Sequence, residues 1–304
     1  MLKLALNDTL FKEKLMYGKK IIFLTIIFLM CANILPAFSR EIDSLKNKLQ
    51  NEDGIEKIKT LNELAGNYWE LSPNERIPFA EQMVELSEKL KDQGYKADAY
   101  NYLGIAYNQL DETQKSMDYF MKALDIAEQT NDKDRIAKSF LNLGQANFYL
   151  VHFDKAQEYF QKLLEIRKEL GDKQGISMAL NQLGTVMAKT KRYDEALDYF
   201  SKSLTIRKEI NYKMGISQIY NNIANVYFDL GEMDKVLEYR LKSLKIVREL
   251  DNKWEIALTT YNIAEYYLTN NEPDKAYPYL IETQNLAEKL DNKGMIRDIT
   301  NIYS

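Results

Sequence analysis

The chain has 304 residues and a formal net charge of −4, with 45% hydrophobic and 28% charged residues. This length and composition suffice to bury a sizeable core. The acidic excess gives the chain as a whole no electrostatic reason to bind nucleic acid or an anionic membrane surface. With only 5 Pro and 12 Gly, the composition favours long helices over many turns.

The first predicted element is an N-terminal leader. Lys19 and Lys20 precede an apolar, uncharged segment at 21–38, and small residues stand near its end. Basic residues, an apolar segment and small residues, in this order, are typical of a secretory signal. We therefore expect a signal peptide at 1–39, cleavage after Ser39, and export to the periplasm or the cell envelope.

Two features of the leader leave alternatives open. Translation from Met16 would shorten the basic region to a more typical length, so Met16 is the favoured start. The apolar segment at 21–38 is also long enough to span a bilayer, and an uncleaved leader would then anchor the chain to the membrane. Cys31, the only cysteine, lies in this segment, so cleavage would leave no disulfide, thiolate nucleophile or cysteine metal site.

After the leader, residues 40–56 form a lead-in, and the stretch at 57–96 is a divergent version of the repeat that follows it. In that stretch LNELAGNYW fits a first helix and FAEQMVELSEKL a second. Pro73 and Pro78 predict a longer join between the two helices, because proline is disfavoured in a helix interior.

From 97 to 296 the sequence repeats five times with a period of forty residues. Small residues recur in two columns, which are Gly104, Gly144, Gly184, Ala224 and Ala264, and then Ser116, Ala156, Ala196, Val236 and Ala276. Apolar residues spaced by three and four predict two amphipathic helices in each repeat. Because one helical hairpin cannot cover its own apolar face, the repeats are expected to stack.

Other columns predict how each hairpin is built. Asp154, Asp194, Asp234 and Asp274 recur just before the second helix, where a short acceptor can cap free N–H groups. Lysines recur past the far end of that helix, at Lys133, Lys173, Lys213, Lys253 and Lys293. Gly144 and Ala156 should mark the contact between the two helices of a hairpin, and Phe120, Phe160 and Phe200 should fill the space between adjacent hairpins.

Small residues eight and twenty places into a hairpin, with "YLGIAY" and "DEALDYF", resemble tetratricopeptide repeats. The forty-residue unit without a helix-ending proline resembles the long-repeat branch, which includes kinesin light chains and bacterial Rap-type peptide sensors. The resemblance implies an all-α fold, a right-handed α-α superhelix of antiparallel helix hairpins. Asn147 and Arg240 stand where the family pattern has aromatic residues, and 297–304 reads as a truncated helix or cap.

No pattern in the sequence points to catalysis. His152, the only histidine, lies in the join between two helices, where an exposed side chain is expected. The chain has no nucleophile elbow, glycine-rich phosphate loop, HExxH motif or calcium loop. We therefore expect no enzyme activity, no cofactor and no metal site.

Asparagines recur two or three places before the small residue of the first helix. The amide side chains in this region that we predict to contact a peptide are Asn101, Asn142, Asn181, Gln182, Asn222 and Asn262. Asparagine is a poor helix former, so its recurrence calls for a reason. The family resemblance implies that first helices line the concave face, where an amide can pair with a peptide backbone. Alternatively, these amides bridge neighbouring helices.

Two functions follow from these observations. The first is an exported scaffold that binds a peptide or protein segment in its groove, without a nucleic-acid partner. The second is the sensory part of an envelope signalling protein that is shortened at its C-terminus.

Overall fold

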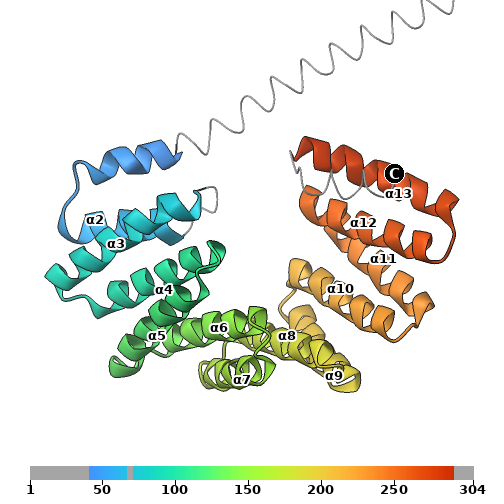
Figure 1. Ribbon diagram of the computed structural model, residues 1–304, viewed down its shortest axis with the longest axis horizontal. Coiled ribbons are helices and arrows are strands. Elements are labelled where there is room, and N and C mark those ends of the chain that lie inside the picture. Colours follow the sequence, from blue (N-terminus) through green and yellow to red (C-terminus); the bar gives the residue numbers. More distant parts are fainter. Residues whose placement is uncertain (1–40, 67–70, 291–304) are drawn as a thin grey trace, which may run out of the picture. The chain divides into compact units, whose positions relative to one another are not determined.

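Figure 1 shows the computed structural model of the chain, which describes residues 41–66 and 71–290. The expected signal peptide, its anchor alternative and the stub at 297–304 lie outside the described residues. Every regular element in the described ranges is a helix. The chain divides into two compact units, of which the first ends at Glu112 and the second begins at Thr113.

The first unit contains a helix at 41–49 and three further helices. These are α2 (Gly54–Gly66), α3 (Pro73–Leu90) and α4 (Gln93–Gln109). The lead-in is thus partly helical, and its Ile42, Leu45 and Leu49 share a buried core with Ile58 and Leu61 of α2. The apolar stripe of the short helix covers the end of this core.

The second unit contains nine labelled helices among its described residues. They are α5 (Thr113–Gln129), α6 (Lys133–Tyr149), α7 (Phe153–Glu169), α8 (Lys173–Lys189), α9 (Tyr193–Glu209), α10 (Lys213–Asp229), α11 (Met233–Glu249), α12 (Lys253–Thr269) and α13 (Pro273–Lys289). Within this unit α6 packs on α7, α8 on α9, α10 on α11 and α12 on α13, and each second helix packs on the next first helix. The all-α repeat superhelix is therefore confirmed.

The structure shifts the predicted repeat boundaries. Two 17-residue helices and two three-residue joins make up the period, so each repeat begins at the first helix. The first of the five begins at Gln93, four residues before 97. The predicted join in the divergent repeat is wrong, because Pro73 is the first residue of α3 and Pro78 lies inside that helix. Proline is tolerated in a first turn, where N–H groups lack helical partners.

The predicted helix caps need a similar correction. Asp154 lies in the first turn of α7, whose N-cap is His152 and carries no side-chain cap. The aspartate column therefore complements the helix dipole and does not cap. Side-chain caps occur instead on first helices, where Asp132, Asp172 and Asn252 accept the N–H groups of the third residue of their helices.

The lysine column begins the first helices and closes the hairpins. In three of these lysines, Nζ lies close to a glutamate Oε2 at the end of the second helix of its own hairpin, whereas Lys253 pairs with Asp251. The pairs are Lys133–Glu169 at 2.9 Å, Lys173–Glu209 at 3.1 Å and Lys213–Glu249 at 3.0 Å. A positive charge at a helix N-terminus is unfavourable by itself, and the facing glutamate offsets it.

The glycine column makes room for the phenylalanine column within a hairpin. A Cβ atom on Gly144 would lie 2.4 Å from the ring of Phe160, and one on Gly184 would lie 2.6 Å from the ring of Phe200. Both phenylalanines are buried. The sequence predicted these rings between adjacent hairpins, and the structure adds their contact with the glycines of their own hairpins.

A second close contact between a glycine and a large side chain joins consecutive hairpins. A Cβ on Gly175 of α8 would lie 2.4 Å from Cδ of Arg167 of α7, and one on Gly215 of α10 would lie 2.8 Å from Cδ of Arg207 of α9. The guanidinium of Arg167 lies 2.7 Å from Asp134 and 3.2 Å from Asp172. One repeat later, Gln174 and Tyr212 stand where those two acids stand.

Arg207 is consequently a buried cation without a carboxylate partner among the described residues. Its Nη1 donates to the Gly215 carbonyl, its Nε has no partner, and burial lowers the pKa of the guanidinium. Tyr212, the N-cap of α10, forms no side-chain cap. Replacing Tyr212 with Asp supplies both a cap and a counter-charge.

We expect Tyr212→Asp to raise the free energy of unfolding by about 1 kcal/mol, because a new cap is worth about that much. The new ion pair offsets the loss of the Tyr212 ring, whose centroid lies 5.6 Å from the Arg207 guanidinium. Urea unfolding measures the change. The matched control is Glu232→Asp at the start of α11, which also lacks a side-chain cap. This site has no buried arginine beside it in the described ranges, so the free energy of unfolding should change less. Equal gains in the two variants would contradict a role for Arg207.

A pH-dependent prediction concerns the cap of α6. Burial acts to raise the pKa of Asp132, but the backbone N–H and the guanidinium of Arg135 outweigh it and hold the pKa below its usual value. The Asp132→Asn variant keeps a cap acceptor and loses the charge. We expect it to be less stable by about 0.5 kcal/mol near neutral pH, because solvent screens the pair.

The pH window of this effect follows from the lowered folded-state pKa. The charge of Asp132 stabilises the folded chain fully at pH values above the unfolded-state pKa of about 3.9. This stabilisation is lost as the pH falls through the lower folded-state pKa. The difference in the free energy of unfolding between wild type and Asp132→Asn should therefore disappear at acidic pH. Urea titrations at a series of pH values measure it, and a difference that widens in acid would rule out this linkage.

Candidate peptide-binding face

The predicted amides occupy one turn of successive first helices. Asn142 of α6, Gln182 of α8, Asn222 of α10 and Asn262 of α12 stand at the same position of their repeats, and all four side chains are half-buried. Asn101 lies on α4 in the first unit, and its side chain is buried. The second unit therefore carries a column of amides that are partly open to solvent.

One pair of these amides bridges neighbouring helices. Nδ2 of Asn222 donates to Oδ1 of Asn181, at 2.7 Å, across the contact between α10 and α8. The alternative of helix bridging thus holds for this pair. A primary amide has a donor group and an acceptor, so the bridge leaves the NH₂ group of Asn181 and the carbonyl oxygen of Asn222 for other partners.

Two further contacts fix the same turn. In the first unit, Oη of Tyr102 donates to Oδ1 of Asn62, at 3.1 Å, between α4 and α2. In the second unit, buried Arg240 of α11 donates from Nη1 to the backbone carbonyl of Asn262. Arg240 stands where the family pattern has an aromatic residue, and burial lowers the pKa of its guanidinium. At this level of the stack, one contact thus joins two first helices and the other joins the second helix α11 to the first helix α12.

Asn221 has a property that stability alone does not explain. Its side chain precedes the bridged Asn222, and its buried Oδ1 has no hydrogen-bond partner in the described part of the chain. An acceptor that is removed from water without a donor costs free energy. The amide-rich turn of α10 is thus retained at a cost to folding.

Apolar side chains lie on the same face and were missed from the sequence. Met178 precedes Gln182 by four residues, and Trp254 precedes Asn262 by eight, spacings that place each pair on one side of its helix. The side chains of Met178 and Trp254 are 37% and 48% exposed. One pattern in the sequence could have revealed Trp254. At its position in the repeat, the residues change from polar to apolar along the chain: Asp134, Gln174, Met214 and Trp254.

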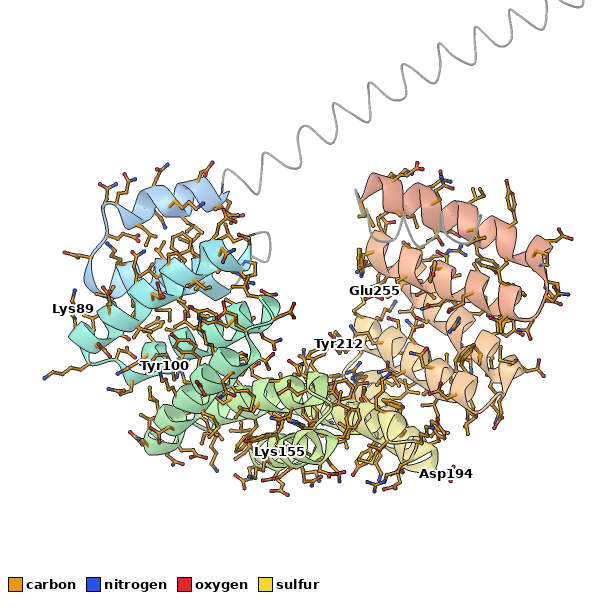
Figure 2. All side chains as sticks on the ribbon, viewed as in Figure 1. Lys89, Tyr100, Lys155, Asp194, Tyr212 and Glu255 are labelled. Carbon is orange, nitrogen blue, oxygen red and sulfur yellow. The ribbon has the colours of Figure 1, made fainter. Side chains whose placement is uncertain are left out.

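The second unit has two long sides, one formed by its first helices and the other by its second helices. In Figure 2, Lys155 of α7 and Asp194 of α9 lie at its lower edge, and Tyr212 marks the start of α10 on the opposite side. Second helices carry charged pairs, such as Lys162–Glu158 and Lys202–Asp198. Exposed apolar side chains occur on both sides, such as Trp254 on α12 and Tyr277 on α13. The repeated column of amides lies on the first helices, so the face that they form is the candidate site.

The described ranges hold no group of three or more His, Cys, Asp or Glu side chains placed to bind a metal ion. His152 is exposed in the α6/α7 join, as expected. None of the described helices is both long enough and apolar enough to span a bilayer. The candidate site is thus formed by the amide and apolar side chains of the first helices.

The sequence matches the tetratricopeptide repeat family over residues 95–169, 135–209 and 215–289. These matches cover more than half of the chain, and the protein belongs to the tetratricopeptide repeat family. No curated protein matches the chain.

Three solved structures are similar in fold. A Rap protein in complex with competence and sporulation factor is 11% identical, with a TM-score of 0.65, over 85% of this chain and 73% of the other. The Rap conjugation gene regulator of plasmid pLS20, in complex with the Phr* peptide, is 16% identical, with a TM-score of 0.63, over 88% and 79%. A signal transduction ATPase with numerous domains from Pyrococcus horikoshii, which has a tetratricopeptide repeat sensor, is 19% identical, with a TM-score of 0.60, over 81% and 41%.

Proposed function

We propose that the chain is a scaffold that binds an extended peptide or a protein segment along the first helices α6, α8, α10 and α12. The observation that carries this proposal is the column of half-buried amides, one on each of these helices. An amide side chain can donate to and accept from a peptide bond, so a column of amides holds a backbone with little regard to its sequence. The peptide complexes of the two Rap proteins support the same use of the fold.

The apolar residues on this face give the ligand a further property. Met178 and Trp254 flank the amides and remain partly exposed. A ligand that carries apolar side chains would cover them and gain the corresponding hydrophobic free energy. We therefore infer a peptide with apolar residues as partner, without a catalytic step. Export to the periplasm or envelope, with or without anchoring through 21–38, remains part of the proposal.

The test is selection of peptides from a displayed random library on the immobilised full-length chain. We expect enriched peptides to contain apolar residues and to bind in calorimetry. Trp254→Ala should weaken that binding, whereas Tyr277→Ala should leave it unchanged, because Tyr277 is an exposed aromatic residue on the second helix α13. Enriched peptides that respond to Tyr277→Ala, or an equal response of both variants, would contradict the proposed face.

A sensor within an envelope signalling system is the second candidate. The fold likeness to a signal transduction ATPase whose repeats form its sensor favours it. The genes next to this one distinguish the two candidates. A neighbouring reading frame for a membrane span with a kinase or DNA-binding module would favour the sensor, and unrelated neighbours would favour the scaffold.

A further inference from the structure

The α6/α7 turn contains a residue in an unfavourable backbone conformation. Val151 has a φ angle of 63°, which places it in the left-handed region. A β-branched side chain is disfavoured there. The other helix ends in this conformation use polar residues or glycine, namely Lys91, Asp111, Asn131, Gly171, Lys191, Asn211, Gly231, Asp251 and Asn271. Valine therefore makes this turn less stable than glycine would.

The same turn exposes an apolar surface. The side chains of Tyr149 and Val151 are 73% and 65% exposed, and Leu150 between them is also exposed. The ring of Phe148 supports them, with its centroid 5.5 Å from that of Phe153 and 6.1 Å from that of Tyr149. The α6/α7 turn thus forms an exposed apolar tip backed by the ring of Phe148, and exposed apolar patches mark contact surfaces.

Basic residues lie beside this tip. The α8/α9 turn holds Lys189, Lys191 and Arg192, and Nη1 of Arg192 reaches Oε1 of Gln157 on α7 at 3.4 Å. The two turns therefore belong to neighbouring hairpins in contact with each other. The charge of Arg192 is paired with Glu195 at 2.5 Å, so the two lysines provide the positive charge of this turn. Lys189 and Lys191 form no ion pair among the described residues. The next turn along the stack, α10/α11, is acidic, with Asp229, Glu232 and Asp234.

We propose that the α6/α7 turn is a membrane-contact site that inserts Tyr149, Leu150 and Val151 into a lipid surface with anionic headgroups. The chain as a whole is acidic, so the attraction is local and comes from the α8/α9 turn. Exposed apolar side chains enter a bilayer surface without a matching pocket, and tyrosine suits the boundary between headgroups and acyl chains. Each lysine near an anionic surface adds about fivefold to the affinity.

The experiment places a fluorescent reporter at the tip of the full-length chain. Leu150→Trp reports on the proposed site, and Leu230→Trp is the matched control, because both leucines end a first helix and are 38% and 41% exposed. Vesicles contain brominated phosphatidylcholine with or without phosphatidylglycerol. With phosphatidylglycerol we expect extra quenching for Leu150→Trp over the unsubstituted chain, and none for Leu230→Trp. This local readout holds whether or not residues 21–38 remain on the chain.

Charge and strain provide two further arms. In the Leu150→Trp background, Lys189→Glu with Lys191→Glu should raise the vesicle concentration needed for half-maximal quenching by at least about 25-fold. Val151→Gly should raise the thermal midpoint by about 2–4 °C, because glycine adopts a positive φ freely, and should weaken quenching.

Several outcomes would overturn the proposal. They are equal quenching at positions 150 and 230, quenching without dependence on phosphatidylglycerol, and a Val151→Gly variant that is no more stable. If vesicles do not quench the tryptophan at position 150 but a bound protein covers the turn, the turn is a protein-docking site. The lipid assignment would then be wrong.

Discussion

Replacing Asn142, Asn222 and Asn262 together with alanine should weaken binding of a selected peptide by roughly a hundredfold or more. Each amide is expected to contribute on the order of 1 kcal/mol to the complex, so single substitutions should weaken binding only a few-fold. Calorimetry with a peptide from the display selection measures the change. A control variant, Gln157→Ala with Gln161→Ala on α7, alters one half-buried and one exposed amide of a second helix and should bind normally.

The thermal midpoint of the same variants separates binding from bridging. Alanine is the better helix former, so the triple variant should fold. The loss of the Asn222–Asn181 bridge should lower the midpoint slightly, and Asn181→Ala alone should reproduce that loss. Unchanged peptide affinity with a lowered midpoint would remove these amides from the site and leave them a bridging role.

The largest expected effect on stability concerns the glycine and phenylalanine columns. Gly144→Ala places a Cβ against the ring of Phe160 and should cost a net 1–2 kcal/mol or so, because overpacking outweighs the gain in helix propensity. Adding Phe160→Leu should recover most of that loss. The last hairpin already has this pair, Ala264 with Leu280.

Urea unfolding of the two single variants and the double variant measures the coupling. A matched cycle with Gly184→Ala and Phe200→Leu in the next hairpin should give the same sign. Additive losses in both cycles would contradict the direct contact between the two columns.

The repeat period made most of the fold predictable from the sequence. Each helix and its amphipathic face recur five times, so chance patterns are averaged out. The prediction of helix caps and of side-chain contacts was less successful, because the sequence of one repeat does not show which side chains touch. Asp154 suits an N-cap and a first turn equally well, and the helix starts one residue before it. The period likewise aligns Gly144 with Phe160 without saying that the ring rests on the glycine.

The candidate site was predictable only in part. The amide column is visible in the sequence, but the Asn181–Asn222 bridge depends on how consecutive first helices are offset, which no single repeat encodes. Trp254 and Met178 look like ordinary first-helix residues until their exposure is known. The strain at Val151 is a property of the backbone, so only the structure could reveal it.

The most direct test of the proposed binding face is photo-crosslinking in an envelope extract. A photoreactive amino acid at Gln182 of α8 lies on the face of the first helices, and the same residue at Gln161 of α7 lies on a second helix. We predict that the chain labelled at position 182 captures a peptide or protein partner and that the chain labelled at 161 does not. Capture from position 161 alone would contradict the proposed face.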